Sequence, residues 1–349
     1  MKKYMVYSDP IVFNDQMLKD INNAKKSIYL ETYIFDKDKL GGCYKEALIK
    51  KAKEGVKIKL LFDSFGSSAK KHFFKELIDL GGEVRPFREL LFVAEIIMNH
   101  ERDHRKLLLI DDHISYVGSA NISEKHLSWR ECVLRAEGNL AIDLERYFLQ
   151  TWNSFSKISR KKLKIILHKS YEIVEDFPSI LHSPSIRKYI KLINNAKKEI
   201  LLETAYFVPP RRIRHALYRA VKRGVNVKIV IPKISDVWLI DQIRSLYLGK
   251  LSKKGIKIFY YKPKILHAKV MSVDDSGFIV GSSNITHRSF VYSYEINLAG
   301  TQPRIVKEIK KHIEESIANS ELFLYEKWRK RPFFKRILEK ILSITERWA

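Results

Sequence analysis

Apolar and polar residues follow the same order in two separate parts of the chain. Residues 21–35, INNAKKSIYLETYIF, and residues 193–207, INNAKKEILLETAYF, both pass from a polar, lysine-rich turn into β-branched and aromatic positions. This change of pattern predicts the end of a helix followed by a strand. Because the two stretches agree at most positions, we interpret them as copies of an internal repeat.

The repeat continues beyond this first pair of segments. Residues 52–63 and 221–232 each predict the end of a helix followed by a buried strand. Both of these helices are expected to close at a glycine, Gly55 in the first copy and Gly224 in the second. A third strand then follows a glycine in each copy, at residues 83–87 and 256–260.

Strand, helix, strand, helix and strand therefore succeed one another in each half, which predicts an α/β fold. We expect two tandem α/β sandwich domains, related by a pseudo-twofold axis, with the active site at their interface. The predicted domains cover residues 1–160 and 161–325, and residues 326–349 form a separate C-terminal segment. The linker is expected in the basic stretch Ser156–Lys169, which has no match in the other half.

A fourth repeated element carries the candidate chemistry. Its two copies have the same spacing and contain His104, Lys106, Asp111, Ser119 and Asn121, and then His267, Lys269, Asp274, Ser282 and Asn284. In a strand, a His and a Lys two positions apart point to the same face. If the halves pack about the pseudo-twofold axis, two imidazoles, two ammonium groups and the phosphate-binding Ser and Asn donors surround one site. Such a set fits a tetrahedral phosphate, which one imidazole can attack while the other protonates the departing alcohol.

Four carboxylates accompany these motifs. Glu131 and Glu295 each follow a predicted strand downstream of a motif histidine. A carboxylate on the far ring nitrogen orients an imidazole and fixes its tautomer, so we expect both glutamates to be histidine-orienting. Asp111 and Asp274 have two interpretations, which are a catalytic role and a structural role in holding a turn or pairing with a lysine.

The two H-x-K-x4-D motifs resemble those of the phospholipase D superfamily, and the resemblance runs from about residue 8 to residue 325. Further strings are similar to those of the bacterial cardiolipin synthases that lack N-terminal membrane spans: RDHRK (102–106), WRE (129–131), TAYFVP (204–209) and RSF (288–290). The sequence departs from that pattern at Ala205, Pro210 and Ser293, where proline, aspartate and asparagine are usual.

The resemblance implies two phospholipase D-like domains and a phosphohistidine intermediate that forms without metal or cofactor. It implies a phosphatidyltransferase that passes a phosphatidyl group from one phosphatidylglycerol to another and releases glycerol. His104 would be the nucleophile and His267 the general acid, and the pseudo-symmetry leaves the reverse assignment open. The alternatives are a phospholipase D-type hydrolase, a nuclease or phosphodiesterase of the same superfamily, and a membrane-binding protein without activity.

Composition adds a preference for polyanionic partners, because the formal net charge is +25. Anionic phospholipid and nucleic acid both qualify, and the apolar segments described next favour lipid and a membrane surface. Two cysteines, Cys43 and Cys132, provide neither a disulfide framework nor a zinc site. We find no signal peptide and no apolar run of the roughly 18 residues that span a bilayer. We therefore expect a cytoplasmic protein that is peripheral on the inner face of the cell membrane; the sequence does not indicate its oligomeric state.

Two segments are candidates for membrane contact. Residues 88–99, RELLFVAEIIMN, form an insertion before His104 that predicts either a buried helix or an apolar lip made of Leu91, Phe92, Ile96 and Ile97. From Lys327 to Ala349 the chain has eight Lys or Arg and two Glu, with apolar residues at helical spacing. We predict a basic amphipathic helix there, either docked on the protein body or lying on anionic lipid through Trp328, Phe334, Ile337, Leu338, Ile341 and Trp348.

Overall fold

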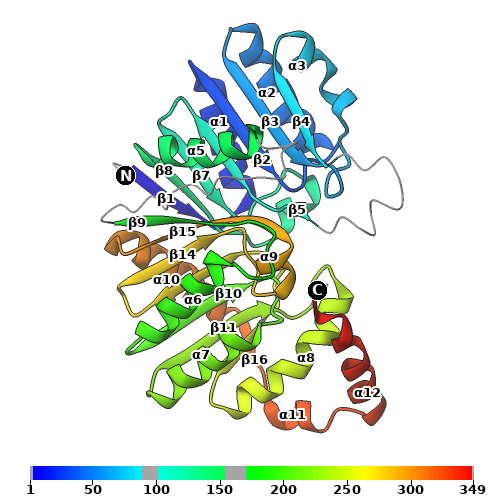
Figure 1. Cartoon of the computed structure of the whole chain (residues 1–349), viewed down its shortest axis with the longest axis vertical. Helices are drawn as coiled ribbons and strands as arrows, with labels where there is room; N and C mark the ends of the chain where they lie inside the picture. The colour runs from blue at the N-terminus through cyan, green and yellow to red at the C-terminus, as the bar shows by residue number, and fades with distance from the viewer. Residues whose placement is uncertain (1–2, 89–100, 154–169, 348–349) are drawn as a thin grey trace.

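The computed structural model describes residues 3–88, 101–153 and 170–347, which form two α/β halves stacked along the long axis of the molecule (Figure 1). This architecture agrees with the predicted fold class. Several predicted features lie outside the described residues, namely the linker Ser156–Lys169, the lip residues Leu91, Phe92, Ile96 and Ile97, and Trp348.

The first half is built on a seven-stranded sheet with the order β1-β8-β7-β6-β2-β3-β4. Its strands are β1 (Lys3–Tyr7), β2 (Ser27–Thr32), β3 (Lys57–Asp63), β4 (Glu83–Phe87), β6 (Leu107–Ile110), β7 (Ile114–Gly118) and β8 (Val133–Glu137). Its helices are α1 (Pro10–Asn23), α2 (Lys39–Lys53), α3 (Lys75–Asp79) and α5 (Leu140–Asn153).

The second half is built on a larger sheet with the order β16-β12-β11-β10-β13-β14-β15-β5, in which β9 also pairs with β15. Its strands are β9 (Tyr171–Asp176), β10 (Glu199–Thr204), β11 (Asn226–Pro232), β12 (Lys257–Tyr261), β13 (Lys269–Val273), β14 (Gly277–Gly281), β15 (Ser293–Gly300), β16 (Ser320–Leu322) and β5 (Arg102–Asp103). Its helices are α6 (Pro184–Asn195), α7 (Arg211–Lys222), α8 (Trp238–Lys253), α9 (His287–Val291) and α10 (Pro303–Ala318).

The predicted repeat is confirmed in these elements. The series β2-α2-β3-α3-β4 of the first half corresponds to β10-α7-β11-α8-β12 of the second, and the three strands of each series run parallel. Gly55 follows α2 with φ +82°, and Gly224 follows α7 with φ +86°. A residue in this left-handed region closes a helix at little cost only when it is glycine, which explains why the helices end where the sequence predicted.

A shared apolar core joins the halves. One cluster of buried side chains includes Leu107 of β6 and Leu134 of β8 from the first sheet together with Val270 of β13 and Leu298 of β15 from the second. Each half also has a core of its own between its sheet and its outer helices. Because the interface is a continuous core, the relative position of the two halves is fixed by packing.

Short stretches of chain cross from one half to the other. The strand β5 comes from the first half but runs parallel to β15 of the second, with Arg102 opposite Ser293 and Asp103 opposite Tyr294. In the reciprocal contact, Arg130 forms an isolated bridge with Leu266. The segments just before the two motif histidines are thereby attached to the opposite half.

The C-terminal segment is two helices, which corrects the prediction of one. The first is α11 (Tyr325–Arg329), the second is α12 (Phe333–Leu342), and the 3₁₀ turn η3 (Ser343–Arg347) follows. Pro332 immediately precedes α12. A proline inside one continuous helix would remove a hydrogen bond and clash with the preceding turn, so the chain starts a new helix there.

Trp328 lies on α11. Its indole Nε1 donates a hydrogen bond of 2.9 Å to the backbone oxygen of Ser245, and its ring occupies the space above Gly249, both on α8. This half-buried side chain therefore anchors the segment to the protein body.

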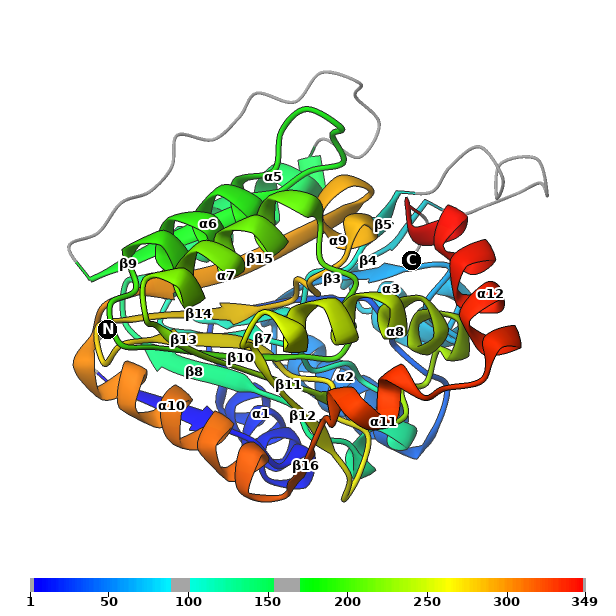
Figure 2. The ribbon, with the colours of Figure 1, turned by 90° about the horizontal axis from the view of Figure 1, so that it is seen from below.

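Beyond this anchor, α12 lies along α8 (Figure 2). Its apolar residues Phe334, Ile337, Leu338 and Ile341 remain exposed, with 73% of Phe334 accessible. Within the described ranges, no helix combines the length and the apolar character needed to cross a bilayer.

Candidate active site

The two motif histidines face one cavity between the halves. His104 precedes β6 and His267 precedes β13, which occupy equivalent places in the two sheets. Both histidines line a cavity of about 590 Å³. Residues from strand ends and loops of each half form the rest of its wall. The structure thus brings together the two copies of the motif across the predicted pseudo-twofold axis.

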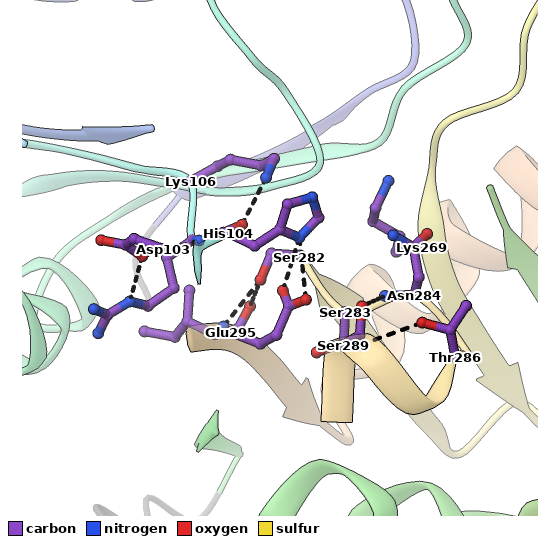
Figure 3. A network of polar contacts seen from close by, with 12 residues as sticks. Asp103, His104, Lys106, Lys269, Ser282, Ser283, Asn284, Thr286, Ser289 and Glu295 are labelled. Carbon is purple, nitrogen blue, oxygen red and sulfur yellow. Dashed lines mark hydrogen bonds and ion pairs between the residues drawn. The ribbon is translucent and has the colours of Figure 1, made fainter. Parts of the chain in front are cut away.

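Each imidazole is held by a glutamate from the opposite half. His104 Nδ1 lies 3.1 Å from both carboxylate oxygens of Glu295 (Figure 3), and His267 Nδ1 lies 2.9 and 3.0 Å from those of Glu131. The crossing of β5 onto β15, and the reciprocal bridge, make these distant residues neighbours. A carboxylate at Nδ1 favours the tautomer protonated there, so Nε2 is the nitrogen that remains for the substrate.

Each motif lysine lies beside its histidine. Lys106 Nζ donates to the backbone oxygen of His104, and Lys269 Nζ to that of His267, both at 2.6 Å. Burial lowers the pKa of Lys106 to about 8 and the pKa of Lys269 to about 7. A bound anion would favour the charged form of both ammonium groups and offset this cost.

Burial and positive neighbours keep the imidazoles neutral. Burial, then Lys106, Lys269 and Arg288, hold the pKa of His104 well below its ordinary value. Burial followed by Lys269 does the same for the pKa of His267. Neutral imidazoles with Nδ1 fixed on a carboxylate are suited to attack an electrophile.

The orienting carboxylates are themselves buried. Burial raises the pKa of Glu295 to about 7 and raises that of Glu131. A positive charge on the imidazole that each glutamate contacts would favour the ionised carboxylate.

The asparagines and serines of the motif occupy different positions. Asn121 and Asn284 line the cavity, and each is anchored through Oδ1 to a backbone amide, so its side-chain nitrogen serves as a donor. Ser119 and Ser282 are fully buried, and their hydroxyls exchange hydrogen bonds with the backbone of Cys132, just before β8, and of Ile296 on β15. These hydroxyls also lower the pKa of the adjacent glutamates, and Figure 3 shows Ser282 beside Glu295. The serines therefore support the orienting residues, and neither of them is among the residues that line the cavity.

The two motif aspartates lie at the opposite ends of β6 and β13 from the histidines. Asp111 accepts hydrogen bonds of 2.7 to 2.9 Å from the backbone amides of residues 25–27. Asp274 accepts three bonds of 2.8 Å from the amides of residues 197–199. Both have a positive φ, of 55° and 51°. This position agrees with the structural role, in which each aspartate holds a turn. It places both aspartates away from the catalytic groups.

Several cavity residues were not singled out from the sequence as site residues. His126 stacks on Trp129 with 3.9 Å between ring centroids, and Trp129 lies edge-on to His267 at 5.2 Å. Tyr206 donates to Asp236 across the cavity wall at 2.7 Å. Trp129 and Tyr206 occur in the strings WRE and TAYFVP, which resemble those of cardiolipin synthases, whereas Asp236 lies in no repeated or recognised string.

No group of three or more potential metal ligands occurs in the part of the chain that the structure describes.

Comparison with known proteins agrees with this geometry. A family model described as "Cardiolipin synthase, PLD-like domain" matches residues 17–158 and 189–317. The chain is 34% identical over 345 residues to the major cardiolipin synthase of Bacillus subtilis (strain 168), covering 93% of this chain and 71% of that protein. It is 32% identical to a cardiolipin synthase of Clostridium perfringens, covering 97% of this chain and 75% of the relative.

A solved structure shares the fold. The phosphatidylserine synthase of Haemophilus influenzae superposes with a TM-score of 0.78 at 14% identity, covering 100% of this chain and 96% of that one.

Proposed function

Because the chain belongs to the cardiolipin synthase family of phospholipase D-like proteins, we propose that it joins two phosphatidylglycerol molecules into cardiolipin and releases glycerol. One observation carries this proposal: a histidine and an asparagine from each half line a single cavity, a motif lysine lies beside each histidine, and each imidazole rests on a glutamate of the other half. Such a set holds one phosphodiester between two imidazoles, which is the arrangement that a transfer in two displacements needs.

The first displacement forms the covalent intermediate. Lys106, Lys269 and the two asparagine side chains hold the donor phosphate and offset its charge. His104 Nε2 attacks phosphorus, the N–P bond forms, and the bond from phosphorus to the glycerol oxygen breaks. Binding of the anionic phosphate favours the protonated form of His267, which gives its Nε2 proton to that oxygen, and glycerol leaves as a neutral alcohol.

The second displacement reverses these steps with a new alcohol. His267, now without its extra proton, removes the proton from a hydroxyl of the acceptor phosphatidylglycerol. The acceptor oxygen bonds to phosphorus as the N–P bond breaks, which yields cardiolipin and restores neutral His104. Glu295 and Glu131 stabilise the positive charge that each imidazole carries during the cycle.

The surroundings of the two imidazoles support this assignment of roles. Arg288 adds to the groups that lower the pKa of His104, which favours the neutral nucleophile. A carboxylate raises the pKa of each histidine, Asp103 that of His104 and Asp236 that of His267, and of the two carboxylates only Asp236 lines the cavity. The pseudo-twofold symmetry of the motif is therefore broken by residues outside it.

We also propose that the enzyme works at the inner face of the cell membrane as a peripheral protein that contacts anionic lipid through α12. The exposed face of α12 has Phe333 and Phe334 beside basic residues, a combination that suits the interface of an anionic bilayer. Phe65, which lines the cavity, is 56% exposed, and Trp238, which lies in the chain between the lining residues Val237 and Leu239, is 61% exposed. The apolar lip within residues 88–99 is a second proposed contact.

Purified protein and phosphatidylglycerol vesicles test the proposal directly. Incubation with excess EDTA should yield cardiolipin and free glycerol in equal amounts, identified by mass spectrometry, because the lysines supply the charge that a metal would bring. Phosphatidic acid as the main product would favour a hydrolase. Activity that disappears with EDTA and returns with a divalent ion would contradict the metal-independent mechanism. DNA cleavage that is lost in His104→Ala would favour a nuclease.

A further inference from the structure

The cavity has a polar pair on the His267 side that the repeat does not explain. Tyr206 and Asp236 both line the cavity, and the Tyr206 hydroxyl donates to Asp236 Oδ1 at 2.7 Å. At the equivalent positions the first half has Ile34 and Ser67. Tyr33 lies beside His104 with 4.9 Å between ring centroids, but among the described residues no carboxylate of the first half lines the cavity. A carboxylate that is present on one side only is not needed to hold the phosphate, which the symmetric groups already surround. It indicates contact with another part of the substrate.

The loop that carries Asp236 is held against α8 by hydrogen bonds to the residues before it. Ser235, before it, donates its backbone N–H to Asp241 on α8 at 2.9 Å. Arg244, also on α8, donates to the backbone oxygen of Lys233 at 2.9 Å and pairs with Asp241 at 3.0 Å. Asp236 therefore projects from a loop fixed to a helix, as a preorganised binding group requires.

The chemistry of this pair restricts what it can bind. An ionised carboxylate only accepts hydrogen bonds and can accept several, of which Tyr206 supplies one to Asp236. It would repel the oxygens of a phosphate, so its partner must offer O–H or N–H groups. Trp129, edge-on to His267, supplies an apolar wall beside the same place. A short carbon chain with free hydroxyls fits this combination.

We propose that Asp236 and Tyr206 form a polyol subsite that binds the glycerol head group beside His267. The inference rests on the proposed phosphatidyl transfer. In an in-line displacement, the leaving oxygen lies on the side of phosphorus opposite the attacking His104. In the second displacement the acceptor oxygen approaches phosphorus from that same side. The subsite therefore receives glycerol twice, as the group that leaves the donor and as the head group of the acceptor, and Asp236 accepts a hydrogen bond from a hydroxyl adjacent to the reacting oxygen.

Transfer to small alcohols tests the subsite without a second lipid. Phosphatidylglycerol vesicles are incubated with labelled glycerol or with labelled 1-propanol, which lacks the additional hydroxyls, and the labelled lipid products are measured. Asp236→Asn should reduce transfer to glycerol about tenfold more than transfer to 1-propanol, since a hydrogen bond to a charged group is lost only with the polyol. Tyr206→Phe should change the same ratio by a smaller factor. Asp275→Asn, which removes a carboxylate that is 78% exposed on its side chain, is the matched control and should leave the ratio unchanged.

Three outcomes would overturn the inference. Equal losses with both alcohols in Asp236→Asn would mean that the residue acts on the reaction itself, and an unchanged ratio in both variants would mean that it contacts neither alcohol. A carboxylate beside aromatic rings also suits an ammonium group, so selective loss of transfer to ethanolamine would identify an amine subsite instead. Wild-type protein that transfers to glycerol but makes no cardiolipin would contradict the proposed function and leave the polyol subsite standing.

Discussion

His104 and His267 have equivalent hydrogen bonds but unequal surroundings, and this difference predicts unequal variants. Alanine at either position should reduce turnover by about 100-fold or more, the usual contribution of covalent or proton-transfer groups. Only His104→Ala should also lose the covalent intermediate. Rapid mixing with phosphatidylglycerol labelled at phosphorus, followed by quenching and separation of the protein, measures that intermediate.

His113 provides a control for this experiment, because its side chain is exposed on the turn between β6 and β7. His113→Ala should retain both turnover and the covalent intermediate. Label on the protein in His104→Ala but not in His267→Ala would reverse the assignment of nucleophile and acid.

The lysines predict the alkaline side of the pH profile. The pKa of Lys269 is lowered to about 7 and that of Lys106 to about 8, in both cases first by burial. Above these values the unliganded site loses the positive charge that attracts phosphate, so kcat/KM should fall as the pH rises through 7 to 8. A bound phosphate favours the ammonium form, so kcat should fall only at a higher pH.

Initial rates at several substrate concentrations between pH 5.5 and 9.5 separate the two parameters. Lys269→Arg should move the fall of kcat/KM to higher pH, because a guanidinium stays charged throughout this range. A kcat/KM that stays constant up to pH 9 would contradict the lowered lysine pKa values.

At the residue scale, the sequence predicted the groups that the repeat duplicates. Two copies at one spacing were sufficient to find the histidines, lysines and asparagines. The exchange of glutamates between the halves was not predictable, because Glu295 and His104 are 191 positions apart and meet only through the pairing of β5 with β15. Asp236 was missed for a related reason: it occurs once, so repetition does not mark it.

At the scale of elements, the turn before β2 explains why an aspartate ends the first motif. Asp111→Ala removes a carboxylate that accepts hydrogen bonds from three backbone amides, and it places alanine at a φ of 55°. We expect the free energy of unfolding to fall by about 1–3 kcal/mol, with activity largely retained at temperatures where the variant is folded. Denaturant titration together with kcat measures both quantities.

Asp111→Asn is the companion variant, because asparagine tolerates the left-handed conformation and keeps an acceptor oxygen. It should lie between wild type and Asp111→Ala in stability. Unchanged stability combined with a loss of activity beyond about 100-fold in both variants would restore the catalytic interpretation of this residue.

Element boundaries set by local chemistry were predictable, and those set by distant contacts were not. The glycines after α2 and α7 close their helices through their own φ, so the sequence alone indicated these ends. Pro332 is an equally local signal, and the prediction of one continuous helix at 326–349 was wrong because the apolar spacing was given more weight than the proline. The two-residue strand β5 has no local pattern and exists only through its pairing with β15.

At the scale of the whole molecule, the position of α12 decides how the enzyme meets its substrate. Its helix FFKRILEKIL has three basic residues and one acidic residue, and Phe333, Phe334 and Ile341 are 73%, 73% and 57% exposed. Trp328 anchors the preceding helix to α8, so the exposed face is presented by the protein body. Binding to anionic vesicles should therefore have an electrostatic and an apolar component.

The two components respond to different changes. Raising the salt concentration from about 0.1 to 1 M shortens the Debye length from about 10 to about 3 Å, and should weaken binding to phosphatidylglycerol vesicles. Replacing Phe333, Phe334 and Ile341 by serine should weaken it further at every salt concentration, because these side chains no longer enter the interface. These substitutions leave the anchor at Trp328 and the cavity residues intact, so transfer from a water-soluble phosphodiester should be retained.

Co-sedimentation with vesicles at low and high salt measures both effects. The matched control replaces Ile11 and Val12, which are 59% and 53% exposed on α1 of the first half, and should bind as the wild type does. If the α12 variant also binds as the wild type does, the contact must lie elsewhere, and the apolar stretch within residues 88–99 becomes the segment to change next. If vesicle binding is lost together with transfer from the water-soluble substrate, α12 is required for the fold of the second half, and the assignment of a membrane-contact role to its exposed face is wrong.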